Sequence, residues 1–180
     1  MVKINLFFLL IAGFSFSQQN TARIKEIDAM VIEIEELNNL EERSYYIEIT
    51  RDTTIIEDDG GNVLRHRASK CQYSSTDFST LQLDIFFLDD PFGGGTYNFY
   101  FKDNKLFFVS FGGGEGGYSF FTYIYYNSLE KPIIFLDEES YIEDDEEIQN
   151  SIIITEEDKQ KEILSEVQGV LNQILRILNQ

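Results

Sequence analysis

The chain has 180 residues and a formal net charge of −18, from 32 acidic and 14 basic residues. Such a charge repels nucleic acid and anionic membrane surfaces, which excludes those partners and favours cations and basic proteins. Aromatic residues make up 14% of the chain. They argue for a packed core, because disorder needs low hydrophobicity as well as high charge.

The N-terminus has the three parts of a secretory signal peptide. Lys3 supplies the positive region, an apolar run spans Leu6 to Phe16, and a cut is expected after the small residue Ser17. The run is too short to cross a bilayer, which needs roughly 20 apolar residues. We therefore expect residues 1–17 to be removed, without stable membrane insertion. Residues 18–180 are expected to form one domain in the periplasm or outside the cell.

Cys71 is the only cysteine, so an internal disulfide cannot form, and a buried apolar role is expected. His66, the only histidine, precedes it by five residues in an expected strand. Side chains alternate along a strand, so an odd separation places the two on opposite faces. Neither a Cys–His nucleophile nor a zinc site is expected, and the pattern indicates no catalytic set, metal or cofactor.

Two amphipathic helices are expected, one at each end of the mature chain. The first spans Thr21 to Asn38, with glutamates such as Glu35 on its other faces. The second begins at an expected N-cap, Thr155, and runs to about Leu178. Their apolar stripes are Ile24, Ile27, Met30, Val31, Ile34 and Leu37 in the first, and Ile163, Leu164, Val167, Val170, Leu171, Ile174, Leu175 and Leu178 in the second.

The region between the helices has the two-residue period of strands. Tight turns such as Asp58–Asn62 and Asp103–Asn104 separate them, and no helix intervenes, so the pairing should be antiparallel. The fold class is therefore α+β, an antiparallel meander sheet of about six or seven strands with N-terminal and C-terminal amphipathic helices. The expected strands are Ser44–Thr54, Asn62–Tyr73, Leu81–Leu88, Thr96–Lys102, Lys105–Phe111, Tyr118–Tyr126 and Lys131–Leu136.

Several strands carry aromatic residues on both faces, which leaves two arrangements open. Either the helices and the curl of the sheet cover both faces, or one face stays a partly open aromatic surface. Tyrosine suits a half-wet face, because its hydroxyl can meet water. The candidate binding residues on this second face are Tyr100, Phe108, Tyr123 and Tyr125.

Two glycine-rich runs and two charged clusters have competing interpretations. Gly112–Gly117 fits a dinucleotide fingerprint, but that site needs a helix afterwards, and an aromatic strand follows. With Gly93–Gly95 it is expected to form strand connections, or a mobile lip at one rim. The basic cluster of Arg65, His66, Arg67 and Lys70 is either an anion site or cross-strand pairing with carboxylates, and the pairing is favoured. The acidic run 137–147 favours a solvated loop over a weak cation site.

The segment Leu6 to Gln18 resembles signal peptides of small exported proteins of Bacteroidota. The stretch Tyr97 to Val109, Tyr-Asn-Phe-Tyr-Phe-Lys-Asp-Asn-Lys-Leu-Phe-Phe-Val, resembles a hairpin in uncharacterised exported proteins of those bacteria, where a helix also precedes a β-meander. The resemblance covers about a third of the chain. It implies an exported location in a Gram-negative cell and carries over no functional residue.

These patterns favour a non-enzymatic exported binding module, of the inhibitor or immunity kind or one that takes an apolar ligand. Its partner would be a basic protein or a small apolar molecule. The alternatives are a carboxylate-dependent hydrolase, which requires two converging acids with raised pKa values, and an envelope assembly factor with an uncovered C-terminal helix.

Overall fold

The computed structural model describes residues 18–39, 46–56, 63–73, 76–87, 94–115, 118–143 and 146–179. The expected signal peptide, residues 1–17, and the expected turn at 58–62 lie outside these described residues. Within them, two helices flank one antiparallel meander sheet, which confirms the α+β class. The sheet has eight strands rather than six or seven.

The strands lie side by side in chain order, each antiparallel to the next. Their bounds are β1 (Tyr46–Ile56), β2 (Val63–Tyr73), β3 (Phe78–Phe87), β4 (Gly94–Lys102), β5 (Lys105–Glu115), β6 (Tyr118–Tyr126), β7 (Pro132–Glu143) and β8 (Glu146–Ile153). The turn between β4 and β5 is Asp103–Asn104, as expected. Its φ angles of 52° and 61° are those of a tight two-residue hairpin.

The additional strand corrects the expectation of a loop over residues 137–147. β7 continues through this acidic run, and β8 pairs with it from Leu136–Ile153 to Glu143–Glu146. Tyr141 lies opposite Ile148 in that ladder. Aromatic and β-branched side chains at these positions favour a pleated surface. The carboxylates of Asp137, Glu138 and Glu139 are tolerated in β7 because their side chains stay partly or fully exposed.

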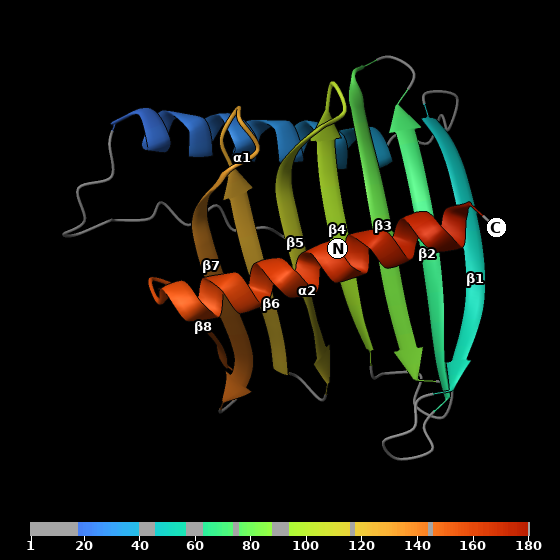
Figure 1. Ribbon diagram of the computed structural model, residues 1–180. Coiled ribbons are helices and arrows are strands. Elements are labelled where there is room, and N and C mark those ends of the chain that lie inside the picture. The colour runs from blue at the N-terminus through green and yellow to red at the C-terminus, as the bar shows by residue number, and fades with distance from the viewer. Residues whose placement is uncertain are drawn as a thin grey trace.

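Helix α2 (Glu157–Leu178) crosses one face of the sheet from β8 toward β1 (Figure 1). Its stripe packs on the inward side chains of the central strands, so that Ile163, Val167 and Ile174 are buried there. Leu175, placed in the stripe by sequence, is 43% exposed, whereas Ile177 is buried. Ile177 continues the spacing of three and four residues that keeps side chains on one helical face.

The start of α2 also differs from expectation. The N-cap is Glu156 rather than Thr155, and it makes no side-chain capping bond. The chain is still tied to the sheet just before the helix, because the Ile154 amide donates to the Phe135 carbonyl at 2.9 Å. The extended backbone therefore continues to Glu156 before the helix begins.

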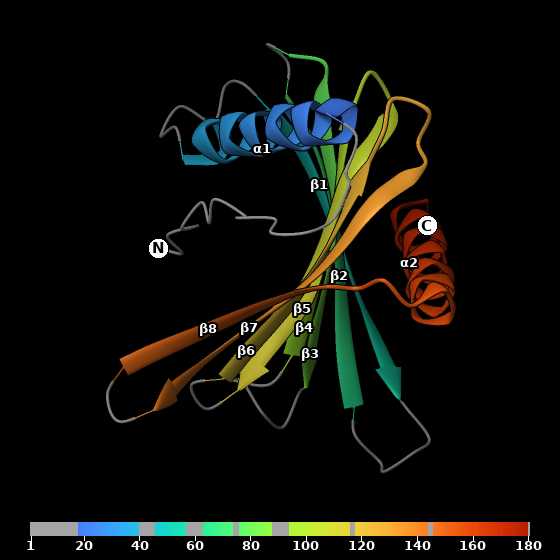
Figure 2. The same ribbon diagram turned by 90° about the vertical axis from the view of Figure 1, so that its left-hand side faces the viewer.

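Helix α1 (Gln18–Asn39) lies on the opposite face of the sheet (Figure 2). Ile27, Met30, Val31 and Ile34 are buried against the sheet, which confirms the expected stripe. In Figure 2, α1 crosses only one end of this face, and no described helix crosses the other end. Neither described helix has the length and apolar character that crossing a membrane requires.

Candidate binding surface

The four aromatic residues expected on an open face form a layer beneath α1. Phe108 is at the centre of the layer, only 5% exposed, and belongs to the cluster that packs on α1. Its ring centroid lies 5.4 Å from that of Tyr100, 6.0 Å from that of Tyr123 and 5.0 Å from that of Tyr125. The three tyrosines are half-buried. The apolar centre of the layer is thus covered, and the tyrosines mark its margin.

Two of these tyrosines bond carboxylates from other elements. The Tyr125 hydroxyl donates to Asp28 of α1, and the Tyr123 hydroxyl donates to Glu138 of β7. Burial, followed by these carboxylates, raises the pKa of both tyrosines well above the usual value. Burial also raises the pKa of Asp28, and the bond from Tyr125 opposes that rise. Both phenols therefore stay protonated and keep their donors on the acids.

The third tyrosine links α1 to the polar part of the sheet. Tyr100 is hydrogen-bonded to Ser110, and burial raises its pKa, with a further rise caused by the charge of Glu35 on α1. Burial raises the pKa of Glu35 itself. We call this group the tyrosine border: Tyr100, Tyr123, Tyr125, Asp28, Glu35 and Glu138.

A row of polar side chains lies beside the tyrosine border, one step along the strands from the layer under α1. We call it the polar row: Ser69, Gln82, Asn98 and Ser110, which stand opposite one another in the ladders of β2 to β5. Asn98 Nδ2 donates to Ser110 Oγ at 3.4 Å, and both serines are buried. Gln82 and Asn98 are half-buried, so the accessible part of the row consists of amide groups, which suit a polar ligand rather than an apolar one.

The basic cluster does not form one anion site. Arg65 Nη2 and Arg67 Nε each lie 3.0 Å from the carboxylate of Asp52 on β1. The hydrogen bond from Arg67, supported by Arg65, holds the pKa of Asp52 below its usual value. Arg67 also stacks over the Phe86 ring, 5.5 Å from its centroid. The expected cross-strand pairing is confirmed for these two arginines.

His66 and Cys71 lie on opposite faces of β2, as their odd separation predicts. His66 is buried on the α2 side, where its Nδ1 is hydrogen-bonded to Gln173. Cys71 packs against the cluster under α1 on the other side. The two cannot act together as a nucleophile and base. Among the described residues no group of histidine, cysteine and acidic side chains is arranged to hold a metal ion.

The glycine-rich runs meet at one rim of the sheet. Gly95 of β4 lies opposite Gly113 of β5, and the next element after this run is strand β6 rather than a helix. A β-carbon at Gly113 would stand 2.2 Å from the carbonyl oxygen of Gly94. Glycine is therefore required there for the close approach of two backbones. Gly116 and Gly117 lie outside the described residues.

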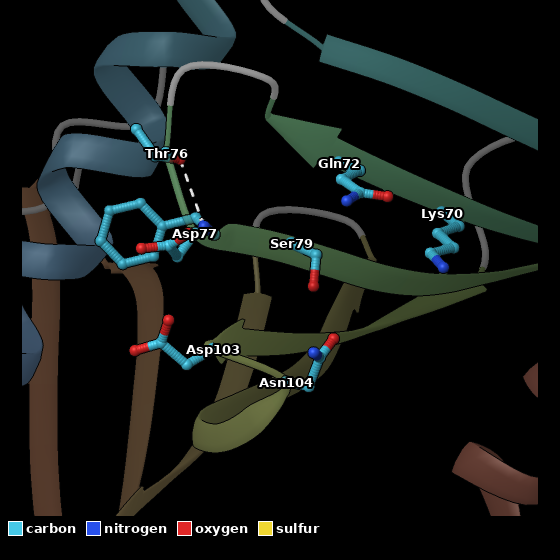
Figure 3. Close-up of a pocket in the computed structure, with 8 residues that line it drawn as sticks. Lys70, Gln72, Thr76, Asp77, Ser79, Asp103 and Asn104 are labelled. Carbon is cyan, nitrogen blue, oxygen red and sulfur yellow. Dashed lines mark hydrogen bonds between the residues drawn. The ribbon is translucent and has the colours of Figure 1, made fainter.

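A shallow hollow of about 180 Å³ opens at the end of the sheet near the β4–β5 turn (Figure 3). The Asp103 amide donates to the Asp77 carbonyl at 3.0 Å, and the Phe78 amide donates to the Thr76 hydroxyl at 3.2 Å. Both aspartates are exposed, so the hollow holds no desolvated acid. The lining residues are Lys70, Gln72, Thr76, Asp77, Phe78, Ser79, Asp103 and Asn104.

Sequence reasoning identified the tyrosines and missed their acidic partners. Glu35, expected on an outer face of the first helix, is half-buried at the edge of the sheet-facing side. A signal was present, because Ile24, Asp28, Val31 and Glu35 recur at spacings of four, three and four. Glu138 had no comparable signal, since it belongs to the run expected to be a loop.

The chain matches no known family model, no curated protein and no solved structure.

Proposed function

We propose that the chain is an exported, non-enzymatic binding protein whose partner is basic, and that the partner binds at the tyrosine border and the polar row. The observation that carries this proposal is the gathering of three carboxylates, those of Asp28, Glu35 and Glu138, around the tyrosines of the border. Burial raises the pKa of all three tyrosines, and the carboxylates of the border raise it further. A lysine or arginine side chain placed there would relieve the partly desolvated acids.

The geometry favours a basic partner over a small apolar ligand. Phe108, the apolar centre of the layer, is buried beneath α1, so an apolar molecule would have to displace the helix. A charged or polar partner meets the hydroxyls, amides and carboxylates at the margin without that cost. The burial of Ile163, Val167 and Ile174 against the sheet argues in the same way against an assembly factor that exposes α2.

The hydrolase alternative needs two acids that converge on one substrate. Asp28 and Glu35 both have raised pKa values, but seven residues of helix separate them by about 10 Å along the axis. The Tyr125 hydroxyl donates to Asp28, whereas the charge of Glu35 acts on Tyr100, so the two acids are placed against different tyrosines. Neither acid lines the hollow near the β4–β5 turn. Binding therefore has more support than hydrolysis.

The test is a graded series of short synthetic peptides whose net charge runs from negative to positive, titrated against the purified chain by fluorescence anisotropy. We expect affinity to rise with positive charge and to fall as salt is added, because screening weakens exposed charge pairs. Equal affinity for acidic and basic peptides would overturn the proposal. Turnover of chromogenic ester or glycoside substrates would favour the hydrolase instead.

A pair of matched variants locates the binding. Glu138→Gln removes one charge from the tyrosine border and keeps the shape of the side chain. Glu162→Gln makes the same change on the exposed side of α2. We expect several-fold weaker binding of the basic peptides to the first variant and little change in the second. Equal effects would mean that the peptides respond to net charge rather than to this surface.

Export is part of the same proposal, and the resemblance to exported proteins of Bacteroidota supports it. N-terminal sequencing of the protein recovered from the periplasm or the medium should begin at Gln18. Recovery of a chain that begins at Met1 from the cytoplasm alone would contradict it.

A further inference from the structure

Glu138 of β7 is a half-buried carboxylate on the same side of the sheet as α1. It accepts hydrogen bonds from the hydroxyls of Tyr123 and Ser151, which belong to β6 and β8. Among the described residues, no lysine, arginine or histidine forms a salt bridge with Glu138. A carboxylate has about four lone-pair positions, so the two hydroxyls leave it able to accept further hydrogen bonds from a cation.

Two aromatic rings of β6 lie beside this carboxylate. Phe121 stands directly opposite Glu138 in the β6–β7 ladder, which places their β-carbons about 4.5–5.5 Å apart. The Phe121 ring is stacked with that of Tyr123, with 6.2 Å between the centroids and 22° between the planes. Phe121 is half-buried and does not belong to the cluster that packs on α1. Part of the stacked pair is therefore open to solvent beside Glu138.

Gly112 of β5 makes room for the Phe121 ring on its other side. It lies opposite Phe121 in the β5–β6 ladder, and a β-carbon there would stand only 2.8 Å from Cδ1 of that ring. The ring thus lies close over the β5 backbone, which places no side chain next to it at this position. A glycine inside a strand often marks a close approach of this kind.

A carboxylate next to stacked aromatic rings suits a guanidinium group. Arginine is planar and stacks on aromatic faces, and its parallel N–H donors match the two oxygens of a carboxylate. It is also less strongly hydrated than the ammonium group of lysine, which matters at a half-buried site because the cation must lose part of its water. The same combination occurs within this chain, since Arg67 donates to Asp52 and stacks over the Phe86 ring.

We infer that the basic partner binds through an arginine side chain, whose guanidinium bonds Glu138 and packs against the rings of Phe121 and Tyr123. We call these three residues the arginine site. The existence of a basic partner rests on the proposed function. The choice of arginine over lysine, and the role of Phe121, rest on the rings beside the carboxylate.

The opposite face of the same two strands offers a matched comparison. There Tyr118 bonds Glu139, and Phe120 stands opposite Glu139 in the ladder. All three side chains are exposed, and the two rings are tilted by 33°. Water and salt screen a cation pair on such a surface. This second set of residues should therefore bind a guanidinium group far more weakly than the arginine site.

The experiment titrates the purified chain with two peptides that have the same length, spacing and net charge, one with arginine and one with lysine at every basic position. We expect the arginine peptide to bind about fivefold tighter by fluorescence anisotropy. In proton NMR spectra of the unaltered chain, the arginine peptide should shift the ring resonances of Phe121 and Tyr123. Those of Phe120 and Tyr118 should stay in place.

Four variants locate the contact. Phe121→Leu removes the ring and should bring the affinities of the two peptides to within about twofold of each other, whereas Glu138→Gln should weaken both peptides. Phe120→Leu and Glu139→Gln make the same changes on the opposite face and should leave both affinities within about twofold of the parent. Should Phe121→Leu fail to fold, the ring resonances of the unaltered chain decide the place.

The outcomes separate the inference from the proposed function. Equal affinity for the arginine and lysine peptides, with basic peptides still preferred to acidic ones in the graded series, overturns the arginine site and leaves the basic partner standing. A preference for arginine that survives Phe121→Leu, or that is lost in Phe120→Leu instead, also overturns it. A lack of preference for basic peptides in the graded series overturns the proposed function, and the arginine site with it.

Discussion

The cover over the tyrosine layer depends on four buried side chains of α1, and Ile34 is the sharpest place to test it. Ile34 is fully buried against the sheet, whereas Ile32 on the same helix is 36% exposed. Ile34→Ala removes three carbon atoms, worth roughly 2.4 kcal/mol at about 0.8 kcal/mol per buried methylene. Incomplete collapse of the cavity brings the expected loss to about 3–4 kcal/mol. Ile32→Ala should cost less than about 1 kcal/mol, since alanine also favours the helix.

Urea denaturation followed by circular dichroism measures both losses. The chain has no tryptophan, so intrinsic fluorescence comes from tyrosines, and it reports the layer under α1 among them. Should Ile34→Ala fail to fold, Ile34→Val removes one methylene and should cost about 0.5–1.5 kcal/mol. If Ile32→Ala proves as destabilising as Ile34→Ala, the orientation of α1 on the sheet is wrong.

Four further predictions concern single positions. Nothing lies within 4 Å of a β-carbon at Gly169, whereas one at Gly112 would stand 2.0 Å from a carbonyl oxygen of β6. Gly169→Ala should therefore raise the free energy of unfolding by about 0.5–1 kcal/mol, and Gly112→Ala should lower the thermal midpoint. Tyr97→Phe loses the 2.6 Å hydrogen bond from the Tyr97 hydroxyl to Glu166 and should cost about 0.5–1.5 kcal/mol in urea denaturation. Burial raises the pKa of Asp28, so its contribution to stability is full below its unfolded pKa and is lost as pH rises through its folded pKa. Denaturation across this pH range should show a flatter profile for Asp28→Asn, and a parent profile equally flat would contradict the burial.

Much of the fold could be predicted from the sequence, because its periods are strong. The spacing of three and four residues from Ile27 to Ile34 fixed the inner side of α1, and two-residue alternation fixed seven strands. The turn at Asp103–Asn104 needed only residues that tolerate positive φ. The eighth strand was missed because the acidic run before it indicated a loop, despite the isoleucines within residues 148–153. An edge strand needs only one of its faces protected from solvent.

The site was less predictable, since it depends on how far each helix covers the sheet. Alternation showed aromatic residues on two faces but could not say that Phe108 joins the buried cluster under α1. Nor could it pair Tyr125 with Asp28 or Tyr123 with Glu138. Each bond joins elements that only the tertiary fold brings together. A titratable residue within an apolar helical stripe, as Asp28 is, remains the one local sign of such a pair.

The charges of the described residues are distributed unequally along the sheet, and this bears on where a basic partner approaches. Arg65 and Arg67 lie on β2, where Asp52 of the neighbouring edge strand neutralises part of their charge. Near the opposite edge, Glu138 of β7 accepts hydrogen bonds from the Ser151 and Tyr123 hydroxyls. The proposed basic partner therefore meets two arginines on the β2 side of the sheet and the carboxylate of Glu138 on the β7 side. Electrostatic steering of this kind raises the association rate more than the final affinity. The proposed basic partner of the tyrosine border should thus lose mainly its association rate when salt is added.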